Sequence, residues 1–113
     1  MKKITLHIES DDLEQLAAVG IAYFNSFNNK YIKQTKDMVL AASEVYKMRN
    51  GSTQMNMLVL YRENGITIDI MGAAGGTGVF NWSWGSEAGF TREMAIRYKN
   101  YCEKHGLKFV GIE

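Results

Sequence analysis

The chain contains no proline and only one cysteine among its 113 residues. A single cysteine excludes an intramolecular disulfide and is typical of a reducing compartment. No run approaches the roughly 18 consecutive apolar residues of a membrane-spanning helix, and the first residues alternate like a strand and do not form a secretion signal. We therefore expect a cytoplasmic protein that does not associate with membranes.

A strong charge of either sign is also missing, since 13 basic residues face 12 acidic ones and the formal net charge is +1. Duplex nucleic acid is normally bound by a clustered basic surface, so it is not an expected partner. The hydrophobic fraction of 46% and the aromatic fraction of 12% suffice for a folded core. A chain of this length predicts one domain over residues 1–113.

Signatures of catalysis or metal binding are absent from the sequence. The two histidines, His7 and His105, fall on a predicted solvated strand face and at a predicted helix end. No Cys, His or Asp cluster has the spacing of a metal site, and helix capping explains the acidic residues at 11–14. Cys102 lies on an apolar helix stripe, which favours a buried, inert thiol. We expect no catalytic residue, metal or cofactor, and an enzyme is the least supported class.

The most informative stretch, 55–85, begins with two strands around Asn64-Gly65. Asn-Gly between alternating apolar runs is the strongest short-range signal for a hairpin with a two-residue turn. That turn pairs Tyr61 with Ile68 and predicts Asp69 on the solvated face, diagonal to Arg62. The alternative for Asp69 is a binding carboxylate. The face expected in the core comprises Met57, Val59, Tyr61, Ile66, Ile68 and Ile70.

Four glycines follow, namely Gly72, Gly75, Gly76 and Gly78. A phosphate-binding loop would require a following Lys-Ser/Thr pair or helix, and neither is seen in the sequence. The glycines therefore predict a flexible or strained connection between strands, because glycine tolerates positive φ. The alternative is a mobile loop that closes over a ligand or partner.

Residues 79–84 alternate and predict a third strand, with Phe80, Trp82 and Trp84 on one side. Three aromatic side chains in register make a large, rigid apolar surface. We expect at least two of them in the core. If that side instead faces out, it is the best candidate interface in the chain.

Periodicity in the remaining sequence predicts three helices and two outer strands. The helices are expected from 11 to about 28, from Thr35 to Gly51 and from Thr91 to about 106, after a loop at 86–90. The strands are expected at 2–9 and 107–112. Gly20 in the first apolar helix stripe predicts a close contact with the sheet. The order β-α-α-β-β-β-α-β predicts an α+β two-layer sandwich, with a mainly antiparallel sheet of about five strands and three helices mostly on one face.

These features favour a small non-enzymatic protein-binding module or inhibitor that acts through a sheet and aromatic surface. Small size and the lack of proline are typical of accessory proteins of phages and mobile elements. The partner would be a protein, and self-association into a homodimer is a further expectation. The candidate binding residues are Trp82, Trp84, Phe80, Asp69, Arg62, Gly75 and Gly76.

The alternative function is a small-ligand or nucleotide binder. Backbone amides of the loop 72–78 would contact the ligand, and Trp82 or Trp84 would stack on its ring. Single-stranded nucleic acid is a third option. The modest cluster of Lys30, Lys33 and Lys36 supports that option weakly, because no basic groove accompanies it.

Overall fold

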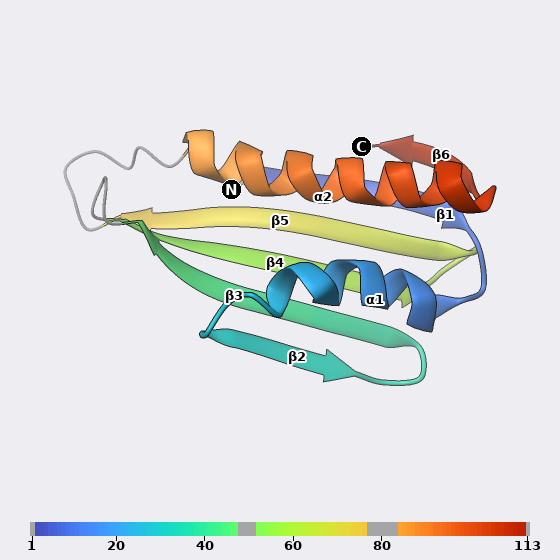
Figure 1. Ribbon diagram of the computed structural model, residues 1–113, viewed down its shortest axis with the longest axis horizontal. Coiled ribbons are helices and arrows are strands. Elements are labelled where there is room, and N and C mark those ends of the chain that lie inside the picture. Colours follow the sequence, from blue (N-terminus) through green and yellow to red (C-terminus); the bar gives the residue numbers. More distant parts are fainter. Residues whose placement is uncertain (1, 48–51, 77–83, 113) are drawn as a thin grey trace.

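The computed structural model describes residues 2–47, 52–76 and 84–112, with side chains described over 2–44, 53–73 and 89–109. It is an α+β domain in which two helices cover one face of a six-stranded antiparallel sheet (Figure 1). The sheet order is β2-β3-β4-β5-β1-β6. The elements are β1 (Lys2–Glu9), α1 (Leu13–Phe24), β2 (Lys30–Gln34), β3 (Met38–Lys47), β4 (Ser52–Arg62), β5 (Ile66–Gly76), α2 (Trp84–His105) and β6 (Lys108–Ile112).

The predicted α+β class is confirmed, but the predicted helix from Thr35 is wrong. Strands β2 and β3 form a hairpin there, and the inward side chains Val39, Ala41 and Ser43 alternate along β3. A short apolar run fits helical and strand spacing alike, and its β-branched and aromatic residues favour the strand. Thr35, which resembles a helix cap, closes the turn, since its Oγ1 accepts a hydrogen bond from the Met38 backbone N–H at 3.1 Å.

The predicted loop at 86–90 is also wrong, because α2 begins at Trp84 and passes Thr91 without interruption. Glycines lower helix propensity in this segment, which explains the sequence-based prediction. Tertiary packing outweighs that preference. The apolar side chains that α2 buries from position 90 onward recur every four residues, and they are Phe90, Met94, Tyr98 and Cys102, with the polar Thr91 buried beside them.

The glycine-rich segment is strand over most of its length, so the predicted bend is wrong up to Gly76. Gly72 pairs with Asn56, and Gly76 pairs with Ser52 on β4. The long partner strand provides ladder hydrogen bonds that overcome the weak strand preference of glycine. Gly78 and the predicted strand residues 79–83 lie outside the described residues.

The β4–β5 hairpin differs from the predicted one by a single residue in its turn. Residues 63–65 form the turn, with positive φ at Asn64 and Gly65, and Arg62 pairs with Ile66. A shift of one residue moves every side chain of one strand to the other face. The predicted core positions of β5 are therefore confirmed, but those of β4 are wrong, because Leu58 and Leu60 are the fully buried residues.

The core lies between the inner sheet face and the two helices. α1 packs on β3 and β4, while α2 packs on β5 and β1. The core residues are Leu6, Ile8, Leu13, Leu16, Ala17, Phe24, Val39, Ala41, Leu58, Leu60, Ile66, Ile68, Ile70, Phe90, Met94, Tyr98 and Cys102. Burial raises the pKa of the Cys102 thiol, which keeps it protonated at neutral pH.

Gly20 marks the closest approach of α1 to the sheet, as its place in the apolar stripe predicted. A Cβ at this position would overlap Leu58 and lie 2.7 Å from the Tyr98 hydroxyl oxygen. We expect Gly20→Ala to lower the free energy of unfolding by about 1–3 kcal/mol through overpacking. This would occur despite a helix-propensity gain of about 1 kcal/mol. Urea unfolding measures the change.

The matched control for Gly20→Ala is Ala18→Gly, at an exposed position of the same helix. Propensity alone predicts a loss of about 1 kcal/mol for that variant. If Gly20→Ala proved more stable than the wild type, helix propensity would dominate at position 20 and the close contact would be wrong.

Candidate pocket between the helices and the sheet

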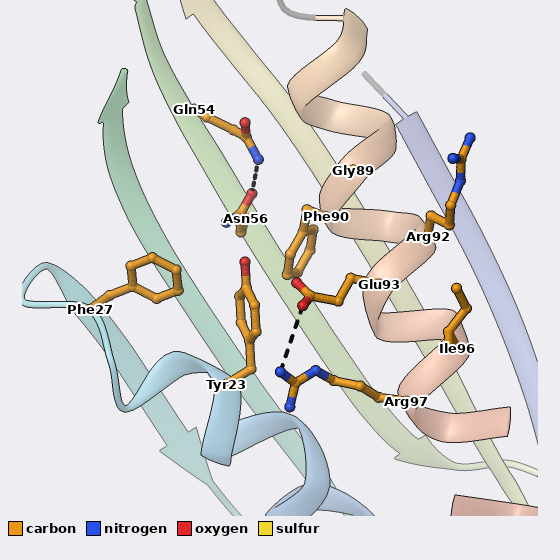
Figure 2. A pocket seen from close by; sticks show the side chains of 10 residues that line it. All are labelled: Tyr23, Phe27, Gln54, Asn56, Gly89, Phe90, Arg92, Glu93, Ile96 and Arg97. Carbon is orange, nitrogen blue, oxygen red and sulfur yellow. Dashed lines mark hydrogen bonds and ion pairs between the residues drawn. The ribbon is translucent and has the colours of Figure 1, made fainter. Parts of the chain in front are cut away.

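An open cavity of about 690 Å³ lies where the two helices diverge over the sheet (Figure 2). α1 and the residues after it form one wall, α2 forms the other, and β4 forms the floor. The cavity is lined by Tyr23, Phe27, Gln54, Asn56, Gly89, Phe90, Arg92, Glu93, Ile96 and Arg97.

The floor of the pocket is polar, in contrast to the rest of the inner sheet face. Gln54 and Asn56 are two residues apart on β4, so their side chains share one face of the strand. They are only 3% and 2% exposed, and the Gln54 Nε2 donates to the Asn56 Oδ1 at 2.5 Å. Ser43, which is 3% exposed, lies directly opposite Asn56 on β3. Three buried polar side chains therefore meet in one place.

Two atoms of this buried polar group have no hydrogen-bond partner within the described part of the chain. They are the Gln54 Oε1 and the Ser43 Oγ. Such an atom costs about 1–3 kcal/mol, and native proteins contain few of them. The Gln54 Oε1 points away from Asn56 (Figure 2). This oxygen is therefore a buried acceptor at the pocket floor whose hydrogen bond no described residue provides.

Aromatic side chains form the walls above this floor. Tyr23 and Phe27 lie with ring centroids 5.2 Å apart, and Tyr23 and Phe90 lie 5.5 Å apart across the two helices. Phe90 is only 3% exposed, so its position is fixed by packing. Rings in such tilted arrangements offer both faces and edges to a planar group.

A charged pair lies at the mouth of the pocket on α2. The Arg97 Nη2 is 3.7 Å from the Glu93 Oε1, and the Arg97 guanidinium lies 5.3 Å from the centre of the Tyr23 ring. Both charged side chains are half-exposed, so the ion pair is weak. Burial, followed by the charge of Glu93, raises the pKa of Tyr23. Its hydroxyl is therefore protonated at neutral pH and can donate a hydrogen bond.

The arrangement offers hydrogen bonding and aromatic packing. Within residues whose placement is described, no three His, Cys, Asp or Glu side chains gather in a way that could hold a metal ion.

The predicted aromatic residues are not placed by the structure as an interface. Phe80 and Trp82 lie outside the described residues, and Trp84 is the first residue of α2, with its side chain outside the described set. A strand that includes Trp84 is therefore wrong. Gly75 and Gly76 pair with Thr53 and Ser52 in the sheet. Gly75 lies one position and Gly76 two positions beyond Ala74, which pairs with Gln54.

Asp69 and Arg62 lie away from the pocket, and their predicted diagonal pairing is wrong. Asp69 opposes Val59 and accepts a hydrogen bond from the Thr5 Oγ1 at 2.8 Å. The Arg62 Nε is 3.6 Å from the Asp37 Oδ1, and its Nη1 donates to the Asp11 carbonyl oxygen at 2.6 Å. The hairpin shift explains the difference, because it moves Asp69 and Arg62 to opposite sheet faces.

Sequence reasoning missed Gln54 and Asn56. The available signal is their spacing, since they continue the alternation of Leu58 and Leu60 towards the start of β4. In the predicted register this face of the strand points to solvent, where amide side chains are common. With the observed register the same two amides are buried polar groups in a core position, which is unusual.

Comparisons with protein-family models, with curated proteins and with solved structures give no match to this chain. Neither helix, over its described residues, has the length and apolar character needed to cross a membrane.

Proposed function

We propose that this protein binds a small planar molecule in the pocket between α1, α2 and β4. The observation that supports this function is the buried Gln54 Oε1 with no partner among the described residues. A ligand N–H or O–H group would provide the missing hydrogen bond. The function belongs to the class of the small-ligand alternative, with Gln54 and Asn56 as its central residues. Residues 72–76 belong to strand β5 and do not form the predicted loop, and a role for the tryptophans stays a prediction.

The pocket chemistry restricts the kind of ligand. Its volume lies within the roughly 300–1,000 Å³ of small-molecule sites. The two amides carry donors and acceptors side by side, which suits a ring with adjacent donor and acceptor groups. Tyr23, Phe27 and Phe90 would pack against that ring. Nitrogen heterocycles of the nucleobase type and aromatic amides meet these requirements, and a negatively charged substituent could reach Arg97 at the mouth.

The double variant Gln54→Leu/Asn56→Leu separates binding from stability. Replacing both partners by apolar groups removes the unpaired Oε1, so we expect the free protein to be as stable as the wild type or more stable by about 1–3 kcal/mol. We expect the variant to lose the thermal stabilisation that a ligand gives the wild type. Differential scanning fluorimetry measures both effects. It is carried out on the free proteins and on the proteins with adenine, uracil or nicotinamide added.

A bound compound at 100 times its Kd should stabilise the wild type by about 2.7 kcal/mol. The control is Gln34→Leu, which removes an exposed amide on β2. It should respond to the compound like the wild type. If the double variant kept the full ligand response, binding would occur elsewhere and the proposed site would be wrong.

The first sequence-based expectation, a protein-binding module or inhibitor of the accessory type, stays a prediction. Its aromatic residues Phe80 and Trp82 lie outside the described residues.

A further inference from the structure

The sheet face opposite the helices is largely apolar over four neighbouring strands, with Lys33, Glu44, Thr67 and Asp69 among its polar positions. The strand pairings place its side chains in rows that run across β2, β3, β4 and β5. We refer to these residues as the open-face patch: Tyr31, Met38, Leu40, Ala42, Met55, Met57, Val59, Tyr61 and Met71.

Three members of the open-face patch are well exposed, and the others are partly exposed. Tyr31 is 57% exposed, Met38 46% and Met55 42%. Four strands spaced by about 4.8 Å and seven residues rising by about 3.3 Å each give a flat area of up to about 440 Å², which includes the polar positions of this face. Soluble monomers rarely expose contiguous apolar patches larger than a few hundred Å². The face therefore has the character of a surface that is covered by a partner.

The size of the patch fits a second copy of the chain. Side chains that stand up from a sheet have more accessible area than its flat projection, so two facing copies would bury more than the roughly 880 Å² of their two flat areas. Stable protein–protein interfaces bury at least about 1,200 Å² of accessible surface in total. Two sheets also pack readily face to face, with their strands aligned within about 30°.

Charge complementarity specifies the arrangement. One row of the face runs from Lys33 through Leu40 and Val59 to Asp69. Lys33 on β2 and Asp69 on β5 thus carry opposite charges in the same row, which continues to Thr5 on β1. A two-fold axis parallel to the strands, between β3 and β4, would place Lys33 of one copy over Asp69 of the other. The same axis would place Leu40 over Val59 and would form each contact twice.

We infer that the protein forms a two-fold homodimer through the open-face patch, with Lys33 of each copy facing Asp69 of the other. This assembly leaves the pocket on the helix side of the sheet open in both copies. It is independent of the proposed ligand.

A charge swap in the full chain tests the dimer. Sedimentation velocity of the wild type should show a concentration-dependent dimer. Lys33→Glu and Asp69→Lys should each weaken association at least tenfold, because like charges then meet across the interface. The double variant Lys33→Glu/Asp69→Lys should regain most of the affinity. Lys104→Glu, on the last turn of α2, is the matched control and should associate like the wild type.

A wild type that stays monomeric at all concentrations would overturn the inference and would leave the patch to another protein. Association without rescue by the double swap would overturn it as well, since the copies would then meet through another surface. Circular dichroism of each variant separates these outcomes from misfolding.

Discussion

Leu60→Lys is expected to abolish folding, whereas Val59→Lys should leave the chain folded. Leu60 has no exposed surface and points into the core, so a lysine there would bury an unpaired charge. The cost is about 4–5 kcal/mol or more, most of the net stability of a small domain. Val59 is on the opposite face, directly across from Asp69, which can pair with a lysine. Circular dichroism and urea unfolding measure both variants.

This pair of variants discriminates between the two hairpin registers. With a two-residue turn at Asn64-Gly65, position 59 would be in the core and position 60 would face solvent. A folded Leu60→Lys chain together with an unfolded Val59→Lys chain would therefore contradict the observed register. It would also remove Gln54 and Asn56 from the pocket floor, because they share the face of Leu60.

Tyr98→Ala is expected to lower the free energy of unfolding by about 3–5 kcal/mol. Tyr98 has the largest fully buried side chain among the described residues, and its hydroxyl donates to the Leu16 carbonyl oxygen at 2.8 Å. It therefore joins α2 to α1 across the core. Truncating a buried aromatic side chain removes its transfer free energy and leaves a cavity. Chemical unfolding followed by tryptophan fluorescence and circular dichroism measures the loss.

Tyr98→Phe is the control, because it keeps the ring and removes only the hydrogen bond. It should cost about 1 kcal/mol at neutral pH. Burial raises the pKa of the Tyr98 hydroxyl above its ordinary value of 10.0. The folded wild type thus holds this proton more tightly, and its stability falls as the pH rises above about 10, by up to about 1.4 kcal/mol per pH unit. Tyr98→Phe should lose this part of the alkaline decline. An unchanged decline would contradict the buried position of the hydroxyl.

Composition and local periodicity predicted the α+β class, the first strand and helix, the last strand and the hairpin around Asn64-Gly65. These features depend on patterns within about ten residues. The close contact at Gly20 was predictable for the same reason, since a glycine within an apolar helix stripe needs a packing explanation.

The strand β3 was not predictable, because Met38, Val39 and Ala42 fit a helical stripe as well as a strand. The choice depends on β4, which follows later in the chain and provides the pairing. The start of α2 at Trp84 was missed because helices are stabilised mainly by tertiary packing, and the packing of α2 on β5 and β1 is not revealed by the segment itself.

The candidate site was missed for a more specific reason. One additional residue in a turn decides which face of β4 is buried, and the sequence signal for the turn does not specify that number. The error turned Gln54 and Asn56 into ordinary solvated amides. It also placed Asp69 beside Arg62. In the structure Asp69 and Arg62 lie on opposite sheet faces, and Asp69 shares a row with Lys33.

The most direct test of ligand binding is an NMR titration of the ¹⁵N-labelled wild type with adenine, uracil and nicotinamide. The side-chain amide resonances of Gln54 and Asn56 can be assigned by their loss in the Gln54→Leu/Asn56→Leu variant. We predict a saturable shift of these resonances with at least one compound, while the Gln34 amide stays unchanged. If every compound left the Gln54 and Asn56 amides unmoved, the pocket would not bind this class of molecule and the proposed function would be wrong.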